Sequence, residues 1–186
     1  MNIMNYAGIG SRKTPPNIIK IMEDIGALMA IDGHICHTGA ALGADQAFAN
    51  GANMVNGQIE LFIPWNTYES LWAATLRNKT ITVFDSKKHI AAADSVRKYH
   101  PGAARLTQGA FKLHARNYLI IEKCSLIICW TMGGKISGGT GQALRIALDS
   151  GIPVMNLGDP ETLARFMERI NIRAKELEVY TKAYRR

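Results

Sequence analysis

Residues 126–157 read Leu126-Ile-Ile-Cys-Trp-Thr-Met-Gly-Gly-Lys-Ile-Ser-Gly-Gly-Thr-Gly-Gln-Ala-Leu-Arg-Ile-Ala-Leu-Asp-Ser-Gly-Ile-Pro-Val-Met-Asn-Leu157, and this stretch decides the fold. The apolar run 126–130 is typical of a strand buried on both faces. A glycine-rich loop follows, and apolar residues then recur at helical spacing from Ala143 to Leu148. Gly151 ends that helix, and the apolar run 152–157 predicts a second strand.

The loop between this strand and this helix is unusually rich in glycine. Glycine lets backbone N–H groups approach a ligand closely, and the N-terminus of a helix favours negative charge. The loop also follows the carboxyl end of a strand, where open α/β sheets bind their ligands. The alternative is a flexible loop between two core strands. The loop does not end in the Gly-Lys-Ser/Thr sequence of the NTPase phosphate loop. We nevertheless predict that it binds phosphate, through Gly133, Gly134, Gly138, Gly139 and Thr140.

Strands and helices alternate along the rest of the chain. Apolar runs at 3–9, 34–38 and 59–65 predict three more strands with helices between them. A longer middle part then leads to a helix predicted at 112–121. This order predicts an α/β protein with a single Rossmann-like, doubly wound, mainly parallel sheet and helices on both faces.

The composition fits one domain. The chain has 186 residues, of which 47% are hydrophobic and 20% are charged, enough for a core of its own. We expect residues 1–158 to form a Rossmann-like nucleotide-binding core. We expect residues 159–186 to form a C-terminal helix, with Pro160 in its first turn, and a basic tail packed on the same domain.

Two N-terminal turns supply further candidate phosphate ligands. Gly10, Ser11 and Arg12 follow the first predicted strand, and Gly39 and Gly43 bracket the loop after the second. Backbone N–H groups and a serine hydroxyl can donate to phosphate, and an arginine can neutralise its charge. A glycine turn beside a solvated arginine is an equally good interpretation of the first turn.

A basic segment precedes the strand at 126–130. No acidic residue occurs between Arg97 and Ile121, and the net charge of +7 favours an anionic partner. A charge run is usually a solvated face. Here it ends in the predicted helix where His114 and Asn117 share one side, with Arg116 adjacent. We therefore predict that these three side chains bind a phosphate.

Three motifs occur in order: Gly8-Ile-Gly-Ser-Arg12, Thr38-Gly-Ala-Ala-Leu-Gly-Ala-Asp45 and Gly133-Gly-Lys-Ile-Ser-Gly-Gly-Thr-Gly141. Over about residues 3–157 the chain resembles the Rossmann-like superfamily of DNA-processing protein A and the "lonely guy" phosphoribohydrolases. It is especially similar to the small stand-alone members of that group in bacteria and phages, and His114-Ala-Arg-Asn117 resembles theirs too. The resemblance implies a nucleotide-type ligand at the carboxyl ends of the strands.

Two functions follow from these motifs. The first is a nucleotide-binding protein that holds a nucleoside phosphate, or the backbone of single-stranded DNA, at the glycine-rich loops. The alternative is a nucleoside 5′-monophosphate N-glycosidase that releases the base. The phosphoribohydrolases carry a catalytic glutamate after their glycine-rich loop, whereas the helix here begins with Gln142, which cannot act as a carboxylate base. Asp45 or Glu69 would then be the catalytic carboxylate, although a first-turn Asp45 also suits the helix dipole.

Other classes of site and location are not favoured. His34, Cys36 and His37 could suggest a metal, but strand alternation places His37 opposite the other two, so we predict no metal and no cofactor. Three cysteines in apolar stretches indicate free thiols in a reducing cytoplasm. No signal peptide is visible, and no run reaches the roughly 18 apolar residues of a membrane span. We expect a homo-oligomer, because exposed helices of this fold class commonly pair.

Overall fold

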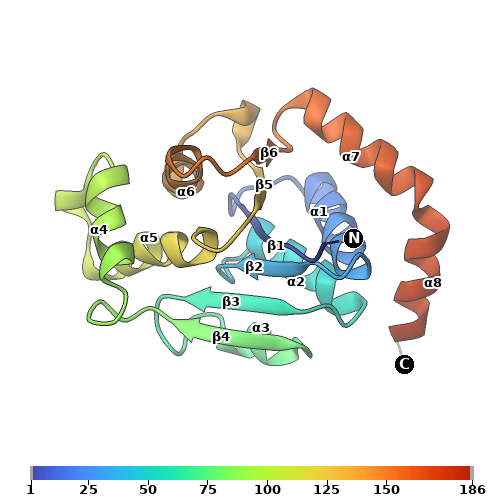
Figure 1. The fold of residues 1–186 in the computed structure, drawn as a ribbon, viewed down its shortest axis with the longest axis horizontal. Helices are drawn as coiled ribbons and strands as arrows, with labels where there is room; N and C mark the ends of the chain where they lie inside the picture. Colours follow the sequence, from blue (N-terminus) through green and yellow to red (C-terminus); the bar gives the residue numbers. More distant parts are fainter. Residues whose placement is uncertain (1, 185–186) are drawn as a thin grey trace.

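The computed structural model describes residues 2–184 and contains one six-stranded sheet (Figure 1). The strand order is β4-β3-β2-β1-β5-β6, and every pairing between these strands is parallel. The predicted α/β class and doubly wound sheet are confirmed, since the crossovers run one way from β1 to β4 and the other way from β5 to β6. The strands are β1 (Asn5–Gly10), β2 (Ile35–Thr38), β3 (Ile59–Ile63), β4 (Lys79–Val83), β5 (Leu126–Trp130) and β6 (Val154–Asn156).

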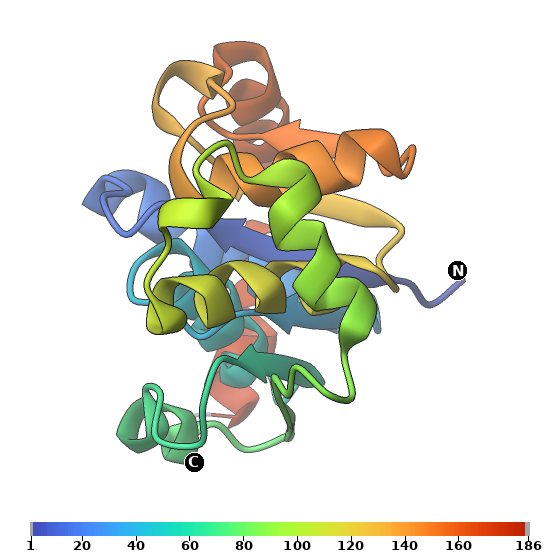
Figure 2. The ribbon, with the colours of Figure 1, turned by 90° about the vertical axis from the view of Figure 1, so that its left-hand side faces the viewer.

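Helices cover both faces of the sheet (Figures 1 and 2). The helices are α1 (Pro16–Ile31), α2 (Ala44–Met54), α3 (Ser70–Thr75), α4 (Ile90–Tyr99), α5 (Gln108–Ile121), α6 (Gly138–Asp149), α7 (Pro160–Ile172) and α8 (Ala174–Tyr184), with short 3₁₀ turns at Ala103–Arg105 and Met132–Gly134. Successive residues of β1 point to opposite faces, so Tyr6 belongs to the core under α1 and α2, and Ala7 to the core under α4, α5 and α6.

Helices α1 and α2 approach each other closely through two glycines. A Cβ atom on Gly26 would lie 2.3 Å from the carbonyl oxygen of Phe48, and one on Gly51 would lie 1.9 Å from that of Glu23. At each of these glycines, the absence of a side chain lets the backbone of one helix contact the backbone of the other. This contact fixes α2, and with it Asp45 in its first turn, relative to the sheet.

Strand β4 and helix α4 were not predicted from the sequence. Strand β4 is an edge strand whose Thr80 and Ile81 are exposed, so it lacks the continuous apolar run of a central strand. Helix α4 buries only Ala92, Ser95 and Val96, and small or polar residues give a weak helical pattern. Both lie in the middle part of the chain, on the way from β3 to α5.

The C-terminal helices return to α1, far from α4 and α5 (Figure 1). Asp159 caps α7 by accepting from the backbone N–H of Thr162 at 2.9 Å. From α7, the side chains of Phe166 and Ile170 pack against the α1 core. Asp32, at the end of α1, accepts from Arg173 at 2.8 Å and from Arg169 at 3.3 Å. The tail continues as α8, and the last two residues of the predicted basic tail, 185 and 186, lie outside the described residues.

Candidate functional site

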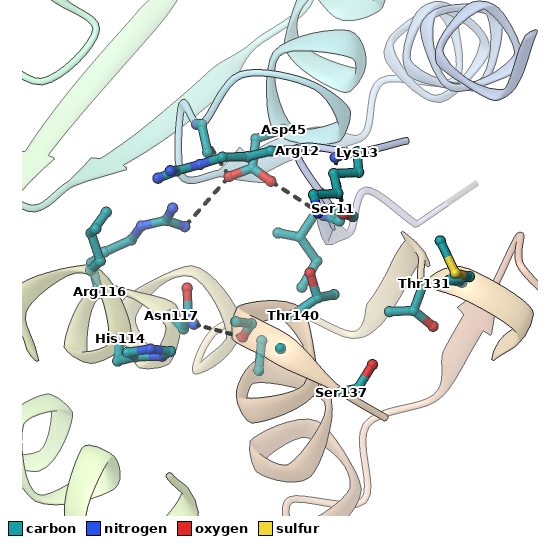
Figure 3. Close-up of a pocket in the computed structure, with 18 residues that line it drawn as sticks. Ser11, Arg12, Lys13, Asp45, His114, Arg116, Asn117, Thr131, Ser137 and Thr140 are labelled. Atoms are coloured by element: carbon teal, nitrogen blue, oxygen red, sulfur yellow. Dashed lines mark hydrogen bonds and ion pairs between the residues drawn. The ribbon is translucent and has the colours of Figure 1, made fainter. Parts of the chain in front are cut away.

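A cavity of about 600 Å³ lies beyond the carboxyl ends of β1 and β5 (Figure 3). These two strands are neighbours in the sheet, and the chain leaves them in opposite directions, so a crevice opens between the two connections. The structure brings ten of the predicted site residues to this one cavity: Gly10, Ser11, Arg12, Asp45, His114, Arg116, Asn117, Gly138, Gly139 and Thr140.

Two predicted glycines lie behind the cavity wall. A Cβ on Gly39 would fall 1.6 Å from Nη1 of Arg116, so the missing side chain makes room for the guanidinium group. Gly43 has φ of +94°, and a Cβ there would lie 2.8 Å from the carbonyl oxygen of Ser11. Both glycines allow the close packing of the β2–α2 loop, but neither lines the cavity.

Three more predicted residues lie outside the lining. Gly133 and Gly134 have φ of +59° and +71° and form the 3₁₀ turn after β5, where Met132 faces the cavity. Glu69 is exposed with φ of +50°, and its carboxylate accepts from Nε2 of Gln46 at 3.4 Å. Of the two alternative candidates for a catalytic carboxylate, Asp45 therefore lines the cavity and Glu69 does not.

Asp45 and Arg116 form a buried ion pair from opposite faces of the sheet. Nη1 of Arg116 lies 3.5 Å from Oδ2 of Asp45, and the two side chains are 7% and 4% exposed. The carboxylate also accepts from the backbone N–H of Gly10 at 3.2 Å and of Ala41 at 3.3 Å. Burial raises the pKa of Asp45, while Arg116 and these N–H groups oppose the rise. The pair joins the β1 turn, the β2–α2 loop and α5.

Asn117 fixes the start of α6. Its amide Nδ2 donates to Oε1 of Gln142 at 2.7 Å and to the carbonyl oxygen of Gly139 at 3.3 Å. Gln142 is fully buried and does not line the cavity. At the position where the sequence lacks a catalytic glutamate, Gln142 therefore holds the glycine-rich loop to α5.

His114 lies against the glycine-rich loop as a neutral imidazole. Its Nδ1 is buried without a hydrogen-bond partner in the described residues, and its ring centroid lies 4.2 Å from that of His100. Burial, the neighbouring His100, and the charges of Arg116 and Arg145 lower the pKa of His114 to about 4. At neutral pH this residue adds no charge to the cavity.

We expect acid to destabilise the fold partly through His114. An unfolded histidine has a pKa of about 6.5, so between that pH and pH 4 the unfolded chain binds more protons, and stability falls as the pH falls. Replacing His114 with asparagine should flatten this part of the curve. Burial lowers the pKa of His37 too, so some slope should remain. Thermal unfolding at pH 7.0, 5.5 and 4.5 measures the effect, and identical curves for both proteins would contradict it.

Three cationic side chains and one helix N-terminus face the cavity. Arg12, Lys13 and Arg116 line it, and Asp45 is the only acidic side chain among the lining residues of the described chain. Helix α6 begins at Gly138 with no acidic residue in its first turn and no side-chain cap from Ser137. Its first N–H groups have no partner within the helix. The cavity is therefore suited to an anion.

Sequence reasoning missed part of this lining. Lys13, Thr131, Met132 and Ser137 line the cavity and were not predicted. Lys13 directly follows the predicted Arg12, and Thr131 directly follows β5. Their position after the carboxyl end of a strand could have indicated both residues as part of the site. Ser137 and Thr140 appear on the same side of the cavity in Figure 3, at the start of α6.

Within residues 2–184 no three histidine, cysteine or acidic side chains are grouped as metal ligands would be. Cys36, Cys124 and Cys129 are free and buried. None of the helices described is both long and apolar enough to cross a membrane. The homo-oligomer, the cytoplasmic location and the division at residue 158 stay predictions.

Comparison with known proteins places this architecture among solved structures. No family model and no curated protein matches the sequence. DNA processing protein A from Helicobacter pylori, whose structure concerns single-stranded DNA binding, aligns with a TM-score of 0.61 and 16% identity over 97% of this chain and 81% of its own. The same protein from Streptococcus pneumoniae gives 0.59 and 19% identity over 83% of this chain and 50% of that one. This chain therefore spans half of the Streptococcus protein's structure.

A second group of similar structures consists of proteins named for the molybdenum cofactor. The molybdenum cofactor carrier protein of Chlamydomonas reinhardtii aligns with a TM-score of 0.53 and 18% identity, over 94% of this chain and 87% of its own. Such identities establish the architecture and not the ligand. The chain has the Rossmann-like fold shared by DNA processing protein A and the molybdenum cofactor carrier proteins.

Proposed function

We propose that this protein binds a nucleotide through its phosphate, in the cavity between the β1–α1 turn and the start of α6. The ligand is a nucleoside phosphate or the phosphate backbone of single-stranded DNA. One observation carries the proposal. Arg12, Lys13 and Arg116 converge with the N-terminus of α6 on a cavity whose single carboxylate is already bonded to other groups.

The individual contacts suit a phosphate. The N–H groups at the start of α6 and the hydroxyl groups of Thr140 and Ser137 are hydrogen-bond donors, and the oxygens of a phosphate can accept from several of them at once. Arg12 donates to the hydroxyl of Tyr68 at 3.4 Å, which leaves other guanidinium N–H groups for a ligand. Ile9, Leu113 and Met132 add apolar surface to the same cavity.

The glycosidase alternative has less support. It needs a carboxylate that can act on the ligand, and Asp45 is held by a guanidinium and two backbone N–H groups. Glu69 does not line the cavity. Release of free base from a panel of nucleoside monophosphates would restore that alternative.

Replacing Gly139 with aspartate should abolish phosphate binding without harming the fold. Gly139 is exposed, has no positive φ, and a Cβ there would meet only Cε1 of His114, at 3.9 Å. A carboxylate in the first turn stabilises a helix by about 0.3–1 kcal/mol but repels an anion. In thermal unfolding, a nucleotide at 100 times its Kd should stabilise the parent by about 2.7 kcal/mol and should leave the variant unchanged.

Gly139→Ala is the matched control. It adds the same Cβ without the charge, so it should retain the ligand-induced shift. A parent protein that no nucleoside phosphate or oligonucleotide stabilises would contradict the proposed function. An aspartate variant that still binds would show that the phosphate lies elsewhere.

A further inference from the structure

Trp65 is an exposed aromatic side chain beside the cavity just described. It follows β3 after Pro64, and 36% of it is exposed. Its ring packs edge-on against Tyr68, with the ring centroids 5.3 Å apart. The hydroxyl of Tyr68 in turn accepts from Arg12, which lines the phosphate cavity. Trp65 is thus linked to the margin of that cavity through two side chains.

A second cavity, of about 390 Å³, opens near the carboxyl ends of β3 and β4. Its polar lining comes from Asn66, Asp85, Ser86, Lys88 and Lys112. Trp65 directly precedes Asn66, one of these lining residues, in the chain.

Helix α5 separates the two cavities. Lys112 lines the second cavity, and the next residue, Leu113, lines the first. One helical turn earlier, a Cβ on Gly109 would lie 3.9 Å from Cζ3 of Trp65, so the indole rests against the first turn of α5. Gly109 and Lys112 are three residues apart, so Trp65 lies against the side of α5 that carries Lys112.

The charge of the second cavity is mixed, with a small positive excess. Lys88 and Lys112 contribute two ammonium groups against the carboxylate of Asp85. That carboxylate accepts from the backbone N–H of Lys87 at 2.8 Å, which orients it and keeps it ionised. A singly charged phosphodiester fits such a site, and removal of the Asp85 charge should improve the fit.

We infer that Trp65 and the second cavity form a further nucleotide subsite, so that the ligand is a single-stranded oligonucleotide. One base stacks on the exposed indole, and the adjoining phosphate lies beside Lys112 and Lys88. Aromatic side chains accept every base as a stacking partner, and lysines follow a backbone without reading sequence. The inference rests on the proposed function, because the first phosphate occupies the cavity at α6.

The test compares thymidine 5′-monophosphate with a 5′-phosphorylated dT tetranucleotide. Affinities are measured by competition against a labelled oligonucleotide and by quenching of tryptophan emission. Trp65→Ala should weaken the tetranucleotide about tenfold, in the range of a lost base stack, with the mononucleotide unchanged. Trp65→Phe keeps an aromatic face, so it should retain most of the affinity while the quenching falls.

Two charge variants act in opposite directions. Lys112→Ala should weaken the tetranucleotide and lower the slope of log affinity against log salt by about 0.7, the value for one phosphate contact on a single strand. Asp85→Asn should tighten the tetranucleotide. Lys182→Ala removes an exposed lysine of α8, on the opposite side of the molecule, and should change neither ligand (Figure 1).

The outcomes separate this inference from the proposed function. If both ligands bind the parent with equal affinity, and Trp65→Ala and Asp85→Asn change nothing, the second subsite is wrong and the phosphate cavity stands. If neither ligand binds the parent, the proposed function fails and the second subsite fails with it. A tetranucleotide that binds more tightly, and loses that advantage in Trp65→Ala, supports the inference.

Discussion

Replacing Asp45 with asparagine is expected to destabilise the fold by about 3–5 kcal/mol, the usual cost of leaving one member of a buried ion pair without its partner. The guanidinium of Arg116 would remain 7% exposed beside a neutral amide. The asparagine has one oxygen for the two backbone N–H groups that now reach separate carboxylate oxygens. For a chain of this length, unfolding should occur at a temperature lower by roughly 6–20 °C.

Two further variants test the cause. Adding Arg116→Met to Asp45→Asn removes both charges, so part of the lost stability should return. Glu69→Gln alters an exposed carboxylate with one long contact, and its effect should stay within about 0.5 kcal/mol. A variant Asp45→Asn as stable as the parent would show that the pair contributes nothing, and Asp45 would again be a candidate for a role in ligand chemistry.

The second large effect is expected at the crossing of α1 and α2. In Gly51→Ala the new methyl group would lie 1.9 Å from the carbonyl oxygen of Glu23, and in Gly26→Ala it would lie 2.3 Å from that of Phe48. Both neighbours are backbone, so the helices must move apart. We expect each variant to lose about 3 kcal/mol, at the upper end of overpacking costs, or roughly 6–12 °C in unfolding temperature.

Gly109→Ala is the control for these helical glycines. The nearest atom to its Cβ is Cζ3 of Trp65 at 3.9 Å, an ordinary contact, so alanine should stabilise α5 by up to about 1 kcal/mol. Opposite signs at the two kinds of glycine would establish close packing as the cause. Equal small effects at all three positions would refute the close helix crossing.

The architecture could be predicted from the sequence because its central strands are continuous apolar runs. Strand β5, the loop after it and α6 carry strong local patterns, and they imply a parallel sheet with helices on both faces. The pattern fails at β4 and α4, where one side faces solvent and the buried residues are few or small. Tertiary contacts with α5 and β3 stabilise these elements, and no local sequence feature reports such contacts.

The site was predictable where it coincides with turns after strands, and in the basic segment at His114, Arg116 and Asn117 of α5, which also line the cavity. Ser11, Arg12 and Thr140 stand at such turns, and they do line the cavity. Gly39 was predicted as a ligand because glycine allows close approach, and the group that approaches it is the side chain of Arg116. The pairing of Asp45 with Arg116 joins α2 and α5 across the sheet, and nothing in either local sequence indicates it.

The pairing of β1 with β5 has a consequence for the order of events during synthesis. Tyr6 of β1 pairs with Leu126 of β5 in the sheet. During synthesis β1 therefore lacks this neighbouring strand until a much later part of the chain has been made. A growing chain that has completed β1 to β4 holds the serine and arginine of the first turn but has no opposite wall. The proposed phosphate cavity is incomplete until α6 has emerged. A nucleotide bound at the proposed site would therefore require a chain complete through α6, and it would join the early and late parts of the polypeptide, whose non-local pairing is slow to form.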